Sequence, residues 1–315
     1  MNGIRLTGTF LDEISHDIPH QNWGKVEWEQ DFQAMKRMGI DTVILIRCGY
    51  QQWLTYPSAV LQKQVDGYRP PLDLVDLFLM LAEKYSMDFY FGTYDSGRFW
   101  TTGEYQKEID INLAVIEEVW QRYGDRAAFK GWYLSQEVSR RTRAITEIYA
   151  RMGQQCKQLS PGLPVLISPW IDGVKSVSSF GGQIQKEQGI TLAQHQAEWH
   201  EIMAAISGAV DIVAFQDGHV DYHQLPEFLA LNKQLAEANG LRCWTNSESF
   251  DRDMPIKFMP IKWEKLLLKL QAAAEVGIEK GITFEFSHFM SPNSCYIQAH
   301  HLYRRYCEHF GLVQT

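Results

Sequence analysis

The chain has 315 residues, of which 45% are hydrophobic and 22% charged, a composition typical of a globular protein with a sizeable core. Its formal net charge of −8 argues against a nucleic-acid partner, because binding of phosphates requires a basic surface. No apolar run reaches the roughly 20 residues that a membrane span needs, so we expect no membrane partner.

The amino terminus and the cysteines favour a cytoplasmic location. Met1 to Gly3 lead directly into a predicted strand instead of an apolar leader. The cysteines are five in number and lack CxxC spacing, which predicts reduced, mostly buried thiols. A secreted or periplasmic location stays open if a leader was removed. The sequence leaves the oligomeric state open as well.

Strand and helix patterns alternate along the whole chain. The predicted strands are Ile4–Phe10, Thr42–Cys48, Asp88–Asp95, Phe129–Glu137, Pro164–Trp170, Asp211–Asp217, Leu241–Glu248 and Gly281–Ser287. The predicted helices are Glu27–Met38, Asp73–Tyr85, Gln106–Tyr123, Arg143–Leu159, Thr191–Ile206, Leu225–Ala238, Ile261–Val276 and Ser294–Phe310. Eight such units and no leftover segment predict one domain over residues 1–315, a closed (β/α)₈ TIM barrel.

The lengths of the connections indicate which face carries the site. Helix-to-strand connections are short, whereas the strand-to-helix connections are long at Leu11–Val26, Gly49–Leu72, Ile171–Ile190 and Asp251–Pro260. The long loops therefore lie on the carboxyl-terminal face of the barrel, where barrel enzymes keep their active sites.

Two predicted strands, the fourth and the seventh, end on a glutamate. Because side chains alternate along a strand, Tyr133 shares a face with Glu137, and Asn246 shares one with Glu248. Strands four and seven lie on opposite sides of a barrel mouth, so the two glutamates can face each other. Retaining glycoside hydrolysis uses such a pair about 5–5.5 Å apart, one as nucleophile and one as acid and then base.

At these residues the chain resembles the retaining β-glycosidases of glycoside hydrolase clan A, and more closely an uncharacterised family of glycosidase-like barrels. The motifs that carry the resemblance are GWYLSQE at 131–137, FQDG at 215–218 and WTNSE at 244–248. The resemblance implies a carbohydrate substrate, no cofactor, Glu137 as acid/base and Glu248 as nucleophile. It also implies that Arg47, at the end of strand two, steadies the nucleophile.

Two positions depart from the clan pattern. Gln136 stands where the clan usually has an asparagine that holds the sugar 2-hydroxyl. The customary tryptophan at the end of strand eight is replaced by Ser287, His288 and Phe289. The identity of the sugar, its linkage and the choice between endo and exo action are therefore left open.

Further polar and aromatic residues at the strand ends are candidates for binding the substrate. Glu285 lies within strand eight, where a buried carboxylate must be paired. It could bind a hydroxyl, replace Glu248 as the nucleophile or pair with Arg47, and we favour a supporting role. The complete set of expected substrate-binding residues is Arg47, Tyr94, Asp95, Gln136, Trp170, Gln216, Asp217, His219, Trp244, Asn246, Glu285 and His288.

Two other classes of function remain open. One is a barrel that binds saccharide without cleaving it, since a fold does not fix an activity. The other is a metal-dependent barrel enzyme such as a sugar isomerase, for which His16, His20 and His219 have suitable side chains. Thr7 to Thr9 lack the HxH pair that metal-dependent barrel hydrolases carry on strand one, so no metal is expected.

Overall fold

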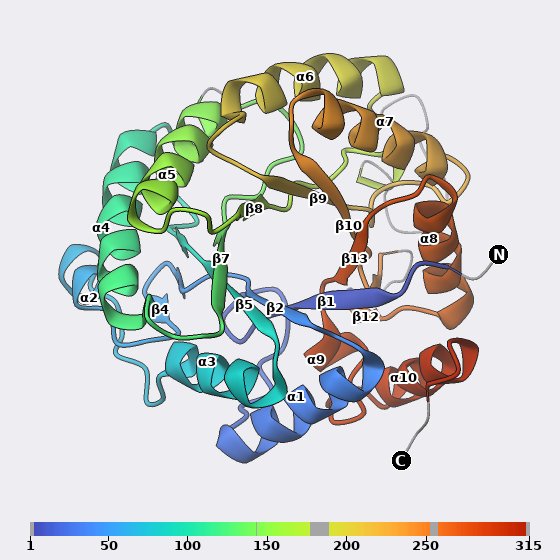
Figure 1. Cartoon of the computed structure of the whole chain (residues 1–315), viewed down its shortest axis with the longest axis horizontal. Helices are drawn as coiled ribbons and strands as arrows, with labels where there is room; N and C mark the ends of the chain where they lie inside the picture. Colours follow the sequence, from blue (N-terminus) through green and yellow to red (C-terminus); the bar gives the residue numbers. More distant parts are fainter. Residues whose placement is uncertain (1–2, 143, 177–188, 253–257, 313–315) are drawn as a thin grey trace.

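The computed structural model describes residues 3–142, 144–176, 189–252 and 258–312. Eight parallel strands close into a barrel in the order β1-β13-β10-β9-β8-β7-β5-β2, inside a ring of helices (Figure 1). The barrel strands are β1 (Leu6–Leu11), β2 (Thr42–Leu45), β5 (Asp88–Gly92), β7 (Phe129–Leu134), β8 (Val165–Ile167), β9 (Ile212–Gln216), β10 (Arg242–Asn246) and β13 (Lys280–Thr283). The prediction of a (β/α)₈ barrel is confirmed.

One long helix follows each barrel strand. These helices are α1 (Lys25–Met38), α3 (Leu74–Tyr85), α4 (Tyr105–Tyr123), α5 (Ile145–Leu159), α6 (Leu192–Ile206), α7 (Leu225–Ala238), α8 (Trp263–Glu275) and α10 (Ile297–His309). Their ends follow local signals in the sequence. Thr191 caps α6 by accepting a hydrogen bond from the backbone N–H of Gln194 at 3.2 Å, and Gly39 ends α1 in the left-handed region at φ 95°.

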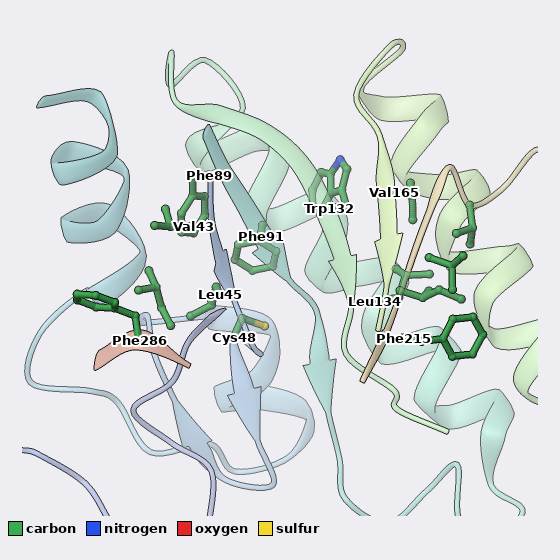
Figure 2. Packing of buried hydrophobic residues seen from close by; sticks show 14 of the residues in the cluster. Val43, Leu45, Cys48, Phe89, Phe91, Trp132, Leu134, Val165, Phe215 and Phe286 are labelled. Carbon is green, nitrogen blue, oxygen red and sulfur yellow. The ribbon is translucent and has the colours of Figure 1, made fainter. Parts of the chain in front are cut away.

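The alternation of side chains along the strands divides the buried residues into two layers. The barrel interior is filled by Phe10, Ile44, Ile46, Tyr90, Tyr133, Leu166, Ile212, Ala214, Trp244 and Ile282. The opposite faces of the same strands pack on the helices, as Figure 2 shows for Phe89, Phe91, Trp132 and Leu134. A strand buried on both faces needs a nearly continuous apolar run, which explains the sequence pattern of these segments.

The long loops after the strands contain small elements that the sequence pattern did not predict. A three-stranded sheet of β3 (Gly49–Tyr50), β4 (Trp53–Leu54) and β6 (Tyr94–Asp95) lies beyond β2 and β5, and α2 (Ala59–Gln64) follows β4. A two-stranded sheet pairs β11 (Phe250–Asp251) with β12 (Met259–Pro260), and a 3₁₀ turn covers Val174–Ser176.

Most predicted strands are a few residues too long, and the eighth and fifth strands show the reasons. The eighth strand ends at Thr283 instead of Ser287, because the chain turns there into a short helix α9 (Phe286–Phe289) that Glu285 caps. The fifth strand covers Val165–Ile167 instead of Pro164–Trp170, since a proline at each end cannot donate to the strand ladder. No helix in the described ranges is long and apolar enough to cross a membrane.

Candidate active site at the barrel mouth

Glu137 lies just beyond β7 and is partly exposed over the barrel mouth. The hydroxyl of Tyr133, whose ring fills the barrel interior, donates a hydrogen bond of 2.6 Å to Glu137 Oε1. Burial raises the pKa of Glu137, and the positive charge of Arg47 and the Tyr133 hydroxyl oppose this rise. The balance favours a carboxyl group that keeps its proton to a higher pH than a free glutamate.

Arg47 lies beside Glu137 and is bonded to Asp95. Its Nη1 donates to Asp95 Oδ2 at 3.3 Å, and its guanidinium lies 5.3 Å from the centre of the Tyr50 ring. Asp95 also accepts from the indole Nε1 of Trp100 at 2.9 Å. The expectation that Arg47 steadies Glu248 is therefore wrong, because the loop after β2 carries the guanidinium toward β6 and Glu137.

Glu248 is held by a different cation, Arg252. The guanidinium of Arg252 donates from Nε to Glu248 Oε2 and from Nη2 to Oε1, both at 2.7 Å. Burial by itself would raise the pKa of Glu248, but the charge and hydrogen bonds of Arg252 outweigh it and lower that pKa. Glu248 is therefore an ionised carboxylate over the neutral pH range.

A buried polar cluster fixes the backbone of Glu248. Asp217 Oδ1 accepts from the backbone N–H of Glu248 at 3.1 Å and from Lys269 Nζ at 2.8 Å. Lys269 Nζ also donates to the Glu248 carbonyl oxygen at 3.0 Å. Burial raises the pKa of Asp217, whereas the charge of Lys269 opposes this rise. The cluster joins β9, β10 and α8 at the carboxyl-terminal end of β10.

Gly218 makes room for the Glu248 carboxylate. A Cβ atom built on Gly218 would lie 1.6 Å from Glu248 Oε2. Any larger residue at position 218 would therefore have to displace the carboxylate. With Arg252 on its other side, Glu248 is only 1% exposed, and the partly exposed Arg252 side chain, at 24%, lies between it and solvent.

A network of neutral side chains extends from Glu137 around the barrel to the end of β10. The Gln216 amide contributes a hydrogen bond that lowers the pKa of Glu137, and its Nε2 donates to the Ser168 carbonyl oxygen at 2.7 Å. Asn246, two residues before Glu248, donates from Nδ2 to Ser168 Oγ at 3.1 Å. Through Ser168 the predicted residues Gln216 and Asn246 thus belong to one network at the ends of β8, β9 and β10.

Trp170 and His219 form a partly exposed ring pair on the same side of the mouth. Their ring centres are 4.9 Å apart, and the backbone of Trp170 forms a bridge with Gln216. Burial and the charge of Arg252 lower the pKa of His219 to about 4, so the imidazole is neutral at neutral pH. Such a pair offers a ring surface and a neutral polar edge to a sugar.

Three predicted substrate-binding residues point away from the mouth. Gln136 donates from Nε2 to the carbonyl oxygen of Tyr94 and to Glu108 Oε1, both at 2.8 Å, within the helix layer. The Tyr94 ring packs in the outer core. Trp244 lies inside the barrel beside Tyr90, with its ring near Arg242 and Lys280 at the amino-terminal strand ends. These three expectations are wrong for two reasons. Gln136 and Tyr94 lie on the face that packs on the helices, because side chains alternate along a strand. Trp244 faces the barrel interior but lies too low in it to reach the mouth.

Glu285 and His288 are also buried under the mouth. The Glu285 carboxylate accepts from the backbone N–H groups of Ser287 and His288 at 2.6 and 2.9 Å, and it is paired with the His288 ring. Glu285 outweighs the effect of burial and raises the pKa of His288 to about 9. Both residues are 0% exposed, and Glu285 caps α9. Of the alternatives left open for Glu285, pairing with Arg47 is wrong, because its carboxylate is paired with His288.

The sequence reasoning missed Arg252, Lys269 and the requirement for Gly218. One signal was present: Lys269 interrupts the apolar stripe of Leu266, Leu270 and Ala273, and a lysine on a buried helix face requires a partner. For metal binding, no three His, Cys, Asp or Glu side chains gather in ligand geometry within residues 3–142, 144–176, 189–252 and 258–312.

Comparison with known proteins places this architecture. A family model described as "Domain of unknown function (DUF4434)" matches residues 6–296. A crystal structure from Bacteroides thetaiotaomicron VPI-5482, described as "a putative alpha-L-fucosidase", is 57% identical with a TM-score of 0.95 and covers 99% of this chain and 97% of that chain. No curated protein matches the chain.

More distant structures share the fold. A β-D-glucuronidase from Dictyoglomus thermophilum is 14% identical with a TM-score of 0.57, covering 98% of this chain and 51% of that one. An intracellular xylanase from Thermoanaerobacterium saccharolyticum JW/SL-YS485 is 10% identical with a TM-score of 0.52, covering 90% and 85%. The match over residues 6–296 and the 57% identity show that the chain belongs to the DUF4434 family, a family of glycosidase-like (β/α)₈ barrels.

Proposed function

We propose that this protein is a glycoside hydrolase that cleaves its substrate with retention, using Glu248 as nucleophile and Glu137 as acid/base. The observation that carries the proposal is the opposite electrostatic environment of the two glutamates. Arg252 lowers the pKa of Glu248, whereas burial raises the pKa of Glu137. A nucleophile must be ionised and a general acid protonated at the same pH, and these shifts favour that combination.

The chemistry proceeds in two steps. A Glu248 oxygen forms a bond to the anomeric carbon while the glycosidic C–O bond breaks, and Glu137 gives its proton to the departing oxygen. Water then attacks the anomeric carbon, Glu137 takes the proton of that water, and the bond to Glu248 breaks. Gln216 is hydrogen-bonded to Glu137, and His219 lies near Glu248 and against Trp170, so these three residues would contact the sugar that reacts.

The two stereochemical classes suggested by the relatives require the same arrangement. The 57% identical structure is described as "a putative alpha-L-fucosidase", whereas the clan A enzymes that the chain resembles are retaining β-glycosidases. An α bond in the L series and a β bond in the D series have the same absolute configuration at the anomeric carbon. We therefore infer that one pair of carboxylates serves either substrate, and a screen should contain aryl α-L-fucosides and aryl β-D-glycosides.

Trapping of the intermediate tests the proposal. A 2-deoxy-2-fluoro glycoside with a good leaving group should inactivate the enzyme, and mass spectrometry of a digest should find the sugar on Glu248. NMR of the first product should show the anomeric configuration of the substrate. Label on another residue, or an inverted product, would contradict the assignment.

One observation favours a second candidate, a barrel that binds saccharide without cleaving it. Glu248 is 1% exposed behind Arg252, so attack requires the guanidinium to move from the side facing the sugar. In the second candidate the ion pair stays closed and the sugar contacts the rim alone. Binding of glycans by NMR, with no release of reducing ends, would favour it.

A further inference from the structure

An exposed aromatic pair lies on the small sheet beside the mouth. Trp53 is 60% exposed and Tyr68 is 52% exposed, and their ring centres are 5.0 Å apart with planes inclined at 55°. Leaving two large rings in water is unfavourable, since each could bury about 150–250 Å² of surface. An exposed pair of this kind marks a surface that a ligand covers.

The pair is held in a fixed position. Trp53 is opposite Tyr50 in the β3–β4 hairpin, while Leu54 points inward and is 6% exposed. Tyr68 is bridged to Trp53, and its backbone N–H donates to the Gln52 carbonyl oxygen at 2.7 Å. Because the backbone already fixes both rings, a ligand would lose little free energy in ordering them.

The same sheet connects the pair with the candidate active site. Tyr50 is opposite Trp53, and its ring lies against the guanidinium of Arg47, which acts on Glu137. Directly opposed residues on neighbouring strands have side chains on the same face, about 5 Å apart. The rings of Tyr50, Trp53 and Tyr68 therefore extend from the mouth outward along one face.

The surroundings of the pair fit a neutral ligand better than a protein. The hairpin turn exposes the side chains of Gln51 and Gln52, and Gln52 Nε2 also donates to the Asp66 carbonyl oxygen at 3.3 Å. Amide groups bond hydroxyl groups without a charge. The other exposed large hydrophobic side chains, Val26, Met80, Leu268 and Ile297, lie on α1, α3, α8 and α10. Two rings alone supply far less than the about 1,200 Å² that a stable protein interface buries.

We propose that Trp53 and Tyr68 form a distal subsite that binds a sugar unit of a neutral oligosaccharide whose other end lies at the mouth. The inference rests on the proposed function for the direction of the chain, since the unit at the mouth is the one that reacts. It predicts that the substrate is an oligosaccharide or a side chain of a polysaccharide, and that affinity rises with length.

The test separates binding from hydrolysis. Saturation-transfer NMR and calorimetry on Glu248→Gln would measure binding of gluco-, xylo-, manno- and galacto-oligosaccharides, from monosaccharide to hexasaccharide. We expect affinity to rise with length, and Trp53→Ala in the same background to weaken binding of the longest bound member about three- to tenfold. Trp53→Phe should retain most of the gain, and Leu268→Ala, on the far helix α8, should change nothing.

Each result decides the proposal. No binding to any member of the panel, equal affinity at all lengths, or unchanged affinity in Trp53→Ala would overturn the distal subsite. Length-dependent binding through Trp53 in a protein that hydrolyses none of the bound sugars would support the subsite and contradict the proposed function. Hydrolysis at the same rate in Trp53→Ala as in the unaltered enzyme would support the proposed function and contradict the distal subsite.

Discussion

Two glutamates of the same barrel lie at the ends of β7 and β10, and both are near an arginine, yet the balance of burial and charge shifts their pKa values in opposite directions. Glu137 is partly exposed and receives hydrogen bonds from a phenol and an amide, both neutral. Glu248 is buried and receives two hydrogen bonds from a guanidinium. The comparison teaches that the neighbours of a carboxylate, more than its place in the fold, assign its role.

The difference also determines the expected pH dependence. As the proposed nucleophile, Glu248 must be ionised, and its lowered pKa places the acid limb of activity below the ordinary range for glutamate. As the proposed acid, Glu137 must be protonated, and its raised pKa places the basic limb above that range. Activity should therefore follow a bell between the two limbs, measured as kcat/KM against pH.

Removal of the ionised glutamate should have the largest effect. We expect Glu248→Ala to lower kcat about 10⁴-fold or more, since no covalent intermediate can form. Added azide should restore turnover by attacking from the vacated side and should give a glycosyl azide of inverted configuration. Turnover by Glu248→Ala in the absence of azide would contradict the role of Glu248 as nucleophile. Circular dichroism should check folding, because the change leaves Arg252 unpaired.

Removal of the protonated glutamate should depend on the leaving group. We expect Glu137→Ala to slow hydrolysis of an alkyl glycoside about 10²- to 10⁴-fold, because the departing oxygen then lacks its proton donor. A dinitrophenyl glycoside needs no proton to leave, so formation of its intermediate should remain near the rate of the unaltered enzyme. Equal losses on both substrates, measured by burst kinetics, would contradict the role of Glu137 as acid.

Displacement of Glu248 should show how narrowly its position is set. Gly218→Ala places a methyl group 1.6 Å from the Glu248 Oε2 position and must move the carboxylate. A shift of about 1 Å costs about 10²-fold in rate, and kcat should fall by that amount. Gly24→Ala is the matched control, because its nearest neighbour would be at 3.3 Å. Normal kcat in Gly218→Ala would show that the carboxylate works elsewhere.

Removal of the Arg252 guanidinium should make the pKa of Glu248 more like that of Glu137. In Arg252→Gln the burial of Glu248 remains but the charge that lowers its pKa is lost, so this pKa should rise. The acid limb of the kcat/KM profile should then move to higher pH, with about a tenfold loss at the optimum. Arg242→Gln removes a surface pair with Glu279 and a contact with the Trp244 ring at the amino-terminal strand ends, far from Glu248, so it should leave the profile in place. An acid limb at the same pH as in the unaltered enzyme would show that the ion pair with Arg252 does not set the pKa of Glu248.

The smallest effect is expected from removal of the Tyr133 hydroxyl. Tyr133→Phe removes a donor that stabilises the ionised form of Glu137, so the pKa of Glu137 should rise further. The basic limb should move to higher pH, while kcat at the optimum falls only about two- to fivefold. A basic limb that moves to lower pH would contradict the claim that the Tyr133 hydroxyl stabilises the ionised form of Glu137.

Much of the fold could be predicted from the sequence. The buried strands are short apolar runs, and the alternation with capped helices admits few other arrangements. The sheet of β3, β4 and β6 could not be predicted, because Gly49–Tyr50 and Trp53–Leu54 are too short to show a period. The early end of β13 could not either, since Glu285 serves as a helix cap only after the chain has turned.

The site was predicted in part for a related reason. The strand pattern places Glu137 and Glu248 at the mouth, because their position follows from the register of β7 and β10. It does not say which cation reaches which carboxylate. Arg252 and Lys269 arrive from a loop and from α8, and the direction of Arg47 depends on a hairpin that has no sequence period.

The amine of Lys269 has a consequence for engineering. It donates hydrogen bonds to the Asp217 side chain and to the backbone carbonyl of Glu248, so the loop between β10 and α8 cannot be exchanged without α8. A chimaera that imports the loop alone would lose the anchor supplied by the helix behind it. Grafts between relatives should therefore exchange residues 242–275 as one block, together with Asp217, which accepts from Lys269.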